Sequence, residues 1–223
     1  MTDVLDTETL FTDAFLEEVE RRKNRDNPTD PTEWRAGGRK SAKWPNKEDA
    51  SWWLTEGPKM VDAWCAWWQQ AKAEGFKVWT TPTGLPAIEL GLNPIIGGQP
   101  FRCYIDAVFE DPDGDLICID WKTGREPVAP MQLGFYKVAL EKTFPGISVD
   151  YGAYYLARKG DLSAPYKLSV YTESLLGDWL RKASDIEKRG DFIPRPSSLC
   201  SACAVRSFCA VMGGKYADQV PNF

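Results

Sequence analysis

Two aspartates and one lysine mark the ends of two neighbouring apolar runs in this 223-residue chain. Asp106 closes the first run, Asp120 and Lys122 close the second, and the turn-forming cluster DPDGD at residues 111–115 separates them. This pattern predicts a β-hairpin. In such a hairpin Asp106 and Asp120 lie at the same end of adjacent strands, where their oxygens can bind one hard divalent cation.

Lys122 stands two positions after Asp120. Because side chains alternate between the two faces of a strand, we expect both on the same face. A basic group beside a cation site can stabilise the charge that develops on a phosphate, so the candidate chemistry is phosphodiester cleavage. The structural alternative is that the aspartates only end strands and Lys122 pairs with one of them.

The surrounding sequence predicts an α/β (α+β) fold, in which a mixed sheet is flanked by helices. Hydrophobic patterning predicts strands over residues 76–80, 87–90, 101–109, 115–121, 150–157 and 166–171. It predicts helices that include Phe11 to Val19, begin at Pro58 and Pro130, and follow the capping residue Thr172. Residues 27–46 lack periodicity and are expected to form a loop.

Gln132 and Tyr136 lie four residues apart on the helix predicted from Pro130 and therefore share one face. The connection from Gly124 to Pro130 is short. We therefore expect this face to look into the same cleft as Asp120.

Composition excludes several classes of protein. Hydrophobic residues make up 43% of the chain and charged residues 26%, as in a globular rather than a disordered protein. No apolar run is long enough to span a bilayer and the acidic N-terminus is unlike a signal peptide, so we expect a cytoplasmic protein without a membrane partner. The formal net charge of −5 argues against non-specific binding of polyanions over the whole surface.

The chain contains no histidine. This excludes Ser-His-Asp and Cys-His catalysis and zinc centres with histidine ligands. Carboxylates, lysine, tyrosine or thiolates must therefore carry any acid–base or metal chemistry.

Tryptophans and basic residues each gather in short stretches. The tryptophan cluster is Trp52, Trp53, Trp64, Trp67 and Trp68. Its helical spacing favours packing over the alternative, a platform on which unpaired bases stack. Basic residues gather at 21–25, 35–43 and 181–189, where a solvated surface is favoured over a track for DNA.

Three cysteines near the C-terminus share short spacings: Cys200, Cys203 and Cys209. Because structural disulfides are rare in the cytoplasm, this spacing favours a bound metal over disulfides. Cys65, Cys103 and Cys118 lie in apolar segments and are expected to be ordinary buried thiols.

The order of these motifs resembles the PD-(D/E)XK nuclease superfamily. The resemblance is carried by Ile105-Asp106, by Asp120-x-Lys122-Thr-Gly and by Gln132-x-x-x-Tyr136. The order is most similar to the RecB-type branch, which includes phage exonucleases and the iron–sulfur exonucleases associated with CRISPR systems. The resemblance spans about residues 57–209.

The resemblance implies a site that binds Mg²⁺ or Mn²⁺. The implied catalytic residues are Asp106, Asp120, Lys122, Gln132 and Tyr136, and the implied metal ligands are Glu89, Asp106, Asp120 and the main-chain carbonyl of Trp121. Gln132 and Tyr136 would contact the substrate or a water on the metal. The three C-terminal cysteines would hold an iron–sulfur cluster or zinc, and the alternative is a remnant without metal.

The chain departs from the family pattern at three places, one of which is Cys103, where family members usually have a small residue three positions before the aspartate. Family members often place a metal-binding histidine four residues after a glycine, where this chain has Val61, with Glu56 and Asp62 as poor substitutes. Iron–sulfur members take a fourth cysteine from before the first nuclease motif, whereas residues 1–64 contain none. A complete four-cysteine cluster would therefore recruit Cys65 or use another type of ligand.

The resemblance implies a restriction-endonuclease-like fold in three parts. These are an N-terminal helix and basic arm (1–50), a nuclease core (51–190) and a cysteine segment packed on the core (191–223). The implied function is a metal-dependent DNA nuclease, an exonuclease on DNA ends or single strands in phage or prokaryotic recombination, replication or repair. DNA and a recombination or replication protein would be its partners.

Two alternatives remain open. Val61 and the absent fourth cysteine favour a non-catalytic DNA-binding module on a decayed nuclease scaffold. The other alternative is a subunit that binds other proteins and whose cysteine metal is structural.

Overall fold

The computed structural model describes residues 6–25, 34, 36–38, 40–190, 196–197, 200, 203 and 205–219. The chain divides into two compact units, Met1–Gly177 and Asp178–Phe223, and each is considered by itself. Among the described residues, no helix combines the length and the apolar character that a membrane crossing requires.

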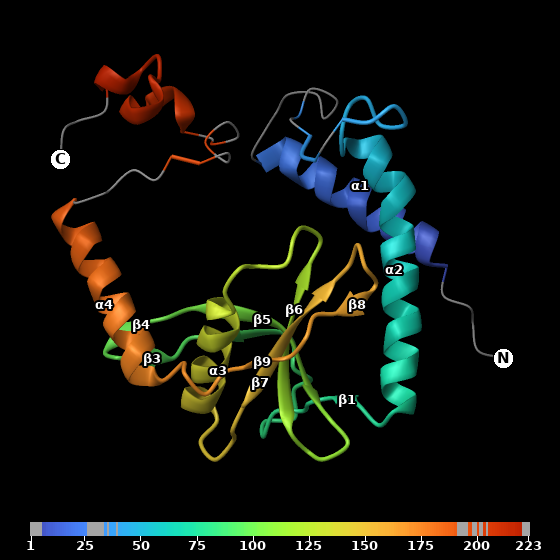
Figure 1. The fold of residues 1–223 in the computed structure, drawn as a ribbon, viewed down its shortest axis with the longest axis vertical. Coiled ribbons are helices and arrows are strands. Elements are labelled where there is room, and N and C mark those ends of the chain that lie inside the picture. Colours follow the sequence, from blue (N-terminus) through green and yellow to red (C-terminus); the bar gives the residue numbers. More distant parts are fainter. Residues whose placement is uncertain are drawn as a thin grey trace. The chain divides into compact units, whose positions relative to one another are not determined.

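The first unit is built on one mixed sheet (Figure 1). Its centre is an antiparallel hairpin of β5 (Cys103–Glu110) and β6 (Leu116–Lys122), and β7 (Tyr151–Leu156) runs parallel to β6. Short strands extend the sheet: β1 (Lys77–Val78) and β2 (Ile88–Leu92) on β5, and β8 (Asp161–Leu162) and β9 (Tyr166–Lys167) on β7. The predicted hairpin and the predicted mixed sheet are both confirmed.

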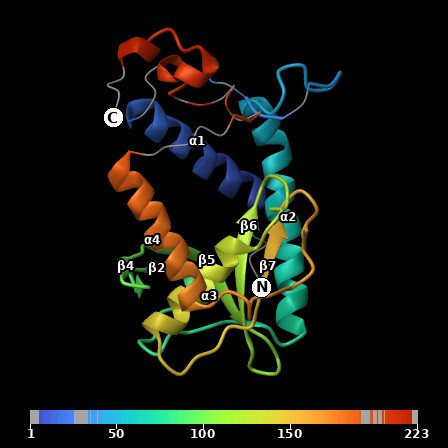
Figure 2. The same ribbon diagram turned by 60° about the vertical axis from the view of Figure 1, so that its left-hand side comes forward.

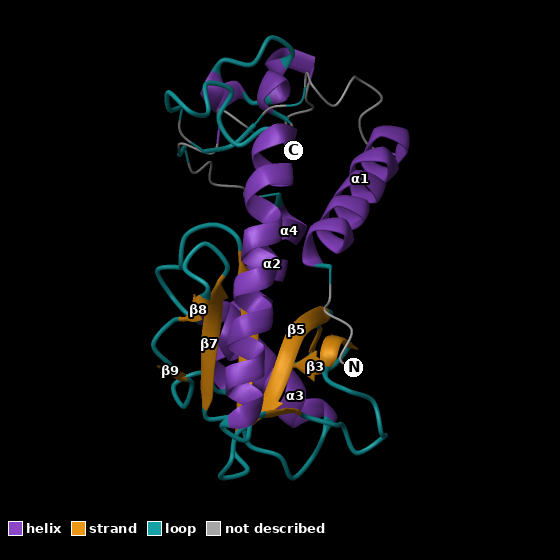
Figure 3. Cartoon of the chain, turned by 90° about the vertical axis from the view of Figure 1, so that its right-hand side faces the viewer, coloured by secondary structure: helices purple, strands orange, loops and turns teal. Residues whose placement is uncertain are grey.

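Helices α2 (Ala50–Ala73) and α3 (Met131–Thr143) cover opposite faces of this sheet (Figures 1 and 3). On the α2 face, three tryptophans pack on one core: Trp64, Trp67 and Trp68 against Ala107, Phe109, Ile119, Ala153 and Tyr155. On the α3 face, Leu133, Ala139 and Leu140 pack against β5, β6 and β7. The packing interpretation therefore holds for these three tryptophans.

Helix α2 begins at Ala50, eight residues before the predicted start at Pro58. Asp49 caps it, since its Oδ1 accepts a hydrogen bond from the Trp52 N–H at 3.0 Å. Pro58 lies inside the helix and is buried together with Gly57. The reason is tertiary: a Cβ on Gly57 would lie 2.0 Å from the Phe11 ring, so the glycine lets α1 (Thr7–Arg25) pack closely on α2 (Figure 2).

The remaining elements differ from the predictions mainly in their length. The strand predicted over residues 166–171 ends at Lys167, and the sequence did not predict β8 or the small hairpin of β3 (Ile95–Ile96) and β4 (Gln99–Pro100). Helix α4 (Glu173–Arg189) begins as predicted, because the Thr172 hydroxyl accepts a hydrogen bond from the Leu175 N–H.

The second unit carries the C-terminal cysteines on short elements. Its described part contains three 3₁₀-helices: η3 (Arg206–Phe208), η4 (Ala210–Met212) and η5 (Ala217–Gln219). The rings of Phe208 and Tyr216 pack at 5.5 Å between centroids. Part of the predicted loop at 27–46 lies outside the described residues, as do 191–195 and several residues between the cysteines.

Candidate functional site

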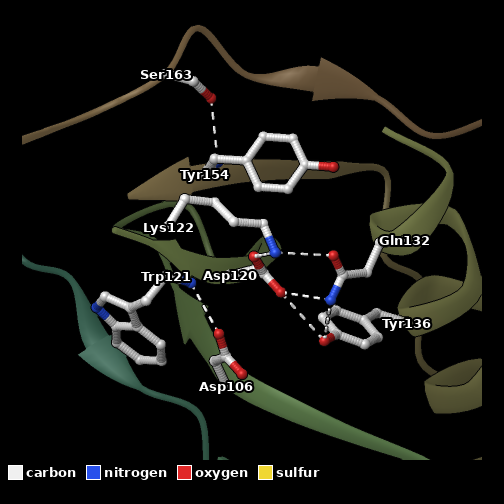
Figure 4. Close-up of polar contacts among 8 residues, drawn as sticks. All are labelled: Asp106, Asp120, Trp121, Lys122, Gln132, Tyr136, Tyr154 and Ser163. Atoms are coloured by element: carbon white, nitrogen blue, oxygen red, sulfur yellow. Dashed lines mark hydrogen bonds and ion pairs between the residues drawn. The ribbon is translucent and has the colours of Figure 1, made fainter. Parts of the chain in front are cut away.

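The two aspartates meet across the β5–β6 hairpin, as the sequence predicts (Figure 4). Ala107 pairs with Ile119, so the antiparallel register places Asp106 opposite Asp120. Oδ2 of Asp106 accepts a hydrogen bond from the main-chain N–H of Trp121 at 2.8 Å. The hairpin therefore fixes one carboxylate of the pair from the backbone of the neighbouring strand.

Asp120 is buried, with 2% of its surface exposed. Its Oδ1 accepts hydrogen bonds from Gln132 Nε2 at 2.7 Å and from the Tyr136 hydroxyl at 3.2 Å. Gln132 Nε2 also lies 2.8 Å from the Tyr136 hydroxyl oxygen, to which it donates. The helix face that carries Gln132 and Tyr136 thus looks toward Asp120, which is the placement predicted from their spacing (Figure 4).

Lys122 reaches the same group of side chains. Its Nζ lies 2.5 Å from Oδ2 of Asp120 and donates a hydrogen bond to Gln132 Oε1 at 2.9 Å. The ammonium also sits over the ring of Tyr154, 5.6 Å from its centroid. Gln132 therefore uses both ends of its amide, accepting from the lysine and donating to the aspartate.

Negative charge exceeds positive charge within this site. Burial raises the pKa of the Asp106 carboxyl above its ordinary value, and the negative charges of Asp120 and Glu89 raise it further. The charge of Lys122 acts in the opposite direction and lowers the pKa of Asp106, but by less than burial and the two carboxylates raise it. A bound divalent cation would relieve this repulsion.

One carboxylate oxygen is left without a hydrogen bond. Oδ2 of Asp120 is buried and receives no hydrogen bond of acceptable geometry, although Lys122 Nζ lies close to it. The ammonium of Lys122 balances the charge of this oxygen at 2.5 Å, and Asp106 and main-chain oxygen supply further hard ligands beside it. The residues therefore fit a hard cation held by Asp106, Asp120 and main-chain oxygen.

The protein ligands at this point are few. Within the described ranges, no three Asp, Glu or Cys side chains gather in the arrangement of a complete metal site. Mg²⁺ is commonly bound by one or two carboxylates, with water and substrate phosphate as its other ligands. Two aspartates therefore suit Mg²⁺ or Mn²⁺ better than a cation that needs a full protein cage.

Glu89 occupies an irregular position of β2. Ile88 pairs with Ala107 and Leu90 with Ile105, so Glu89 lies opposite Asp106. Its φ is 49°, a left-handed conformation that non-glycine residues rarely adopt and that costs about 1–3 kcal/mol. Such strain gathers at functional sites.

The partner strand is irregular at the same level. Ile105 packs in the core under α3, whereas Ala107 packs in the core under α2, although the two should share one face. The alternation of β5 therefore breaks at Asp106, directly across from the strained Glu89.

Tyr136 is a neutral hydrogen-bond donor in this environment. Burial raises the pKa of its hydroxyl above the ordinary tyrosine value, and the negative charge of Asp120 raises it further. The hydroxyl therefore keeps its proton at neutral pH and can donate it in the hydrogen bond to Asp120.

Trp121 contributes to both faces of the sheet. Its main chain holds Asp106, while its side chain packs on the α2 face against Trp64, with 5.1 Å between ring centroids and an interplanar angle of 73°. The site is thus anchored through the sheet to the tryptophans of α2.

Sequence reasoning missed Arg158 and Tyr154. Arg158 donates hydrogen bonds to the carbonyl oxygen of Thr123 and to both carboxylate oxygens of Glu48, at 3.0 and 2.8 Å for the latter. Tyr154 lies beside Asp120 in the parallel β6–β7 register. Period-two patterning could have placed Tyr154 on the Asp120 face, but only if the register of β7 had been known.

The substitutes considered for the missing histidine lie in surface interactions. Asp62 accepts a hydrogen bond from Thr7, and Glu56 pairs with Lys59 at 2.9 Å. Neither is engaged with the aspartate pair, which agrees with their description as poor candidates.

The cysteines fall into two groups. Cys103 and Cys118 are buried, and burial raises the pKa of the Cys103 thiol to about 11. Cys65 is only partly buried, which corrects the prediction, because it lies at the edge of the α2 stripe. In the second unit the Cys203 N–H donates to the Cys200 carbonyl at 3.3 Å, so the main chains of these two residues lie close together.

Comparisons with known proteins agree with these observations. A family model described as "PD-(D/E)XK nuclease superfamily" matches residues 10–210. The Gene 69 protein of Mycobacterium phage D29 is 30% identical over 187 residues, which cover 75% of this chain and 67% of that protein. The Gene 69 protein of Mycobacterium phage L5 is 30% identical over 206 residues, which cover 75% of this chain and 69% of that protein.

Proposed function

The chain belongs to the PD-(D/E)XK nuclease superfamily, and on this basis we propose that it is a divalent-metal-dependent deoxyribonuclease of the RecB type. Its substrate is DNA with ends or single-stranded segments, on which it acts as an exonuclease. Such an enzyme would act in phage recombination, replication or repair in the host cytoplasm. A recombination or replication protein would be its partner.

The observation that carries this proposal is the network around Asp120, which joins a lysine of the same strand to an amide and a hydroxyl of α3. The two carboxylate oxygens of Asp120 lie within 3.2 Å of Gln132, Tyr136 and Lys122. The Lys122–Asp120 pair alone also fits the structural alternative, so the proposal rests on the combination of this pair with Gln132 and Tyr136. The raised pKa of Asp106 further supports a cation at this position.

Each residue has a definite role in this proposal. Asp106, Asp120 and the main-chain carbonyl of Trp121 would hold Mg²⁺ or Mn²⁺, with Glu89 as a further carboxylate. The cation supplies Lewis acidity toward a phosphate and lowers the pKa of a water. Lys122 stabilises the negative charge that develops on the phosphate oxygens, because its ammonium is held close to Asp120.

Gln132 and Tyr136 act as positioning residues. Gln132 fixes Lys122 with its carbonyl oxygen and Asp120 with its amide nitrogen. Tyr136 donates to the same carboxylate oxygen. Together they hold the lysine and the aspartate in one orientation before substrate binds, which lowers the reorganisation needed in the transition state.

The test is incubation of the purified protein with linear and circular DNA, single- and double-stranded, in Mn²⁺, Mg²⁺ or EDTA. We expect cleavage only with metal, and a loss of about a thousandfold in the Lys122→Ala variant, as for removal of one charge stabiliser. Lys159→Ala is the matched control, because this lysine is exposed on the β7–β8 turn. Undiminished cleavage by Lys122→Ala, in preparations free of other nucleases, contradicts the proposal.

The same assay distinguishes the proposed nuclease from the main alternative. A non-catalytic DNA-binding module on a decayed scaffold would bind DNA without cleaving it under any metal condition. The departure at Val61 motivates this alternative. Retention of the complete set of contacts around Asp120 favours the enzyme, since loss of selection for cleavage would first remove a strained and electrostatically costly site.

The C-terminal thiols form a second part of the proposal. Cys200, Cys203 and Cys209, with Cys65 or another ligand, would hold an iron–sulfur cluster or zinc. Anaerobic purification should give protein that absorbs near about 400 nm or contains about one zinc per chain. Colourless, metal-free protein with the same melting temperature as its Cys200→Ser variant identifies the thiols as a remnant.

A further inference from the structure

A large cavity lies in the first unit, between α1 and the beginning of α2. Its volume is about 1060 Å³. The lining that matters here consists of Phe11, Phe15, Arg22, Trp34, Trp53 and Thr123. Helices α1 and α2 supply most of these residues, and Thr123 belongs to the loop that follows β6. The cavity therefore reaches the segment that directly continues from Lys122.

The wall of the cavity combines aromatic rings with a cation. Phe11 and Phe15 stack on each other, with 5.8 Å between centroids and an interplanar angle of 12°. Trp34 and Trp53 add two indole rings, and Arg22 adds a guanidinium. Arg22 is paired with Glu18, so the rings are the groups that a base can use: aromatic rings on which bases stack are typical of sites that bind single-stranded nucleic acid.

Three carboxylates also line the cavity: Glu18, Glu48 and Asp49. Glu18 is bound by Arg21 and by Arg22, the latter at 2.6 Å, and these contacts lower its pKa to about 2. Glu48 is held by two nitrogens of Arg158. Glu18 and Glu48 are thus paired with arginines, and Asp49 accepts the hydrogen bond of the Trp52 N–H as the cap of α2. These contacts reduce the repulsion of a phosphate but do not attract it, so the aromatic rings carry the binding of a base.

Arg158 fixes the boundary between the cavity and the candidate active site. Its guanidinium bonds the carbonyl oxygen of Thr123 and the carboxylate of Glu48, and it stacks on Trp52 at 4.8 Å from the ring centroid. The loop after Lys122 is therefore tied to the wall of the cavity.

The chemistry of the occupant follows from what each form of DNA exposes. In a duplex the base faces are stacked and the pairing edges are used, so aromatic rings reach neither. An unpaired nucleotide exposes both faces of its base and can stack on an aromatic ring. The cavity is at the upper end of ligand-pocket volumes, about 300–1,000 Å³, which leaves room for a base and its sugar.

We propose that this aromatic cavity binds unpaired bases of the DNA strand whose backbone lies at Asp106, Asp120 and Lys122. The inference rests on the proposed nuclease function and makes it more specific. It assigns the substrate preference to a second site, formed by α1 and the start of α2. A strand is selected by its unpaired bases there and cut at the neighbouring phosphates.

Binding is measured without cleavage. A fluorescein-labelled oligothymidylate, a blunt duplex of equal length, and an abasic strand of equal length are titrated with protein in EDTA, and fluorescence anisotropy is recorded. We expect tighter binding of oligothymidylate than of the other two. Trp34→Leu and Phe15→Leu, which keep apolar volume but remove a ring, should each weaken oligothymidylate binding by about tenfold and leave the abasic strand unchanged.

Trp44→Leu is the matched control, since Trp44 lies in the same segment as Trp34 but does not line the cavity. Melting temperatures identify any variant that is misfolded, and the α1 variant Phe15→Leu then serves in place of Trp34→Leu. Equal weakening of all three DNA ligands, or none in either cavity variant, overturns the inference.

The binding assay tests the role of the cavity separately from the proposed nuclease activity. Metal-dependent cleavage with unchanged affinity of the cavity variants for oligothymidylate leaves the nuclease intact and removes the base-binding role. Selective loss of oligothymidylate binding, without cleavage by the native protein under any metal condition, supports the cavity and removes the nuclease. If a protein rather than DNA occupied the cavity, the variants would leave the affinities for all three DNA ligands unchanged. That result counts against the inference.

Discussion

The two faces of strand β6 differ sharply within three consecutive residues. Asp120 and Lys122 point toward α3 and join Gln132 in a polar network. Trp121, between them, points toward α2 and packs against Trp64. The alternation of a strand thus places reactive groups on one face and their support on the other.

The two faces of β6 therefore contribute differently to stability and to function. The α3 face at the end of the hairpin holds carboxylates whose mutual repulsion and burial are unfavourable in the absence of a cation. The core of the α2 face consists of packed aromatic rings and aliphatic side chains. We therefore expect changes on the polar face to alter cleavage with little loss of stability, and changes on the aromatic face to do the reverse.

The largest expected effect on stability is that of Trp64→Ala. Trp64 contacts Trp67, Trp121 and Tyr155, so its removal leaves a cavity between α2 and the sheet. We expect a loss of about 3 kcal/mol in the free energy of unfolding, near the lower end for buried aromatic residues. Urea denaturation measures it.

Trp44→Ala is the control for this prediction. Trp44 lies in the segment before α2, and its ring contacts Lys43 rather than the core. A destabilisation of Trp64→Ala no greater than that of Trp44→Ala would contradict the role given to the aromatic face.

Asp106→Asn is expected to increase the stability of the metal-free protein, by less than Trp64→Ala decreases it. Burial raises the folded-state pKa of Asp106 above its unfolded value, so the folded state binds more protons between these two values. The metal-free protein therefore loses stability as pH rises through this window. The uncharged asparagine removes that loss and can still accept the hydrogen bond from the Trp121 N–H.

Thermal melts in EDTA and in Mn²⁺ test this prediction. At neutral pH without metal, Asp106→Asn should melt a few degrees above the native protein. Adding Mn²⁺ should raise the melting temperature of the native protein by mass action and leave the variant almost unchanged. If Mn²⁺ stabilised both proteins equally, Asp106 would not be a metal ligand.

Most of the polar face was predictable from the sequence, because its side chains are placed by a short turn, by the two-residue period of a strand and by the spacing along a helix. The hairpin follows from the DPDGD turn, the shared face of Asp120 and Lys122 from a period of two, and that of Gln132 and Tyr136 from helical spacing. No interaction between distant segments was needed for these expectations.

Features that depend on distant segments were not predictable. Tyr154 reaches Lys122 because β7 pairs in parallel with β6, and no residue type encodes that register. The start of α2 was misplaced because Pro58 is a local signal for a helix start, whereas the contact of Gly57 with Phe11 is tertiary. The conformation of Glu89 likewise depends on the pairing of β2 with β5.

The smallest expected effect is on kcat and concerns Tyr136, a residue of the polar face. Tyr136→Phe removes one hydrogen bond to Asp120 Oδ1, at 3.2 Å, while Gln132 still donates to that oxygen at 2.7 Å. We therefore expect a loss of about tenfold in kcat, in the range for one hydrogen bond to a charged group. Gln132→Ala should cost more, because Gln132 also holds Lys122.

The pH profile distinguishes positioning from proton transfer by Tyr136. Burial and the charge of Asp120 hold the pKa of Tyr136 above its usual range, so the hydroxyl stays protonated throughout the neutral range. Loss of a positioning group lowers kcat by the same factor at every pH and leaves KM unchanged, because substrate binding is not affected. Loss of a proton donor instead removes one limb of the profile. A profile of kcat against pH that keeps its shape in Tyr136→Phe assigns the tyrosine to orientation of Asp120, and a missing limb assigns it to the chemical step.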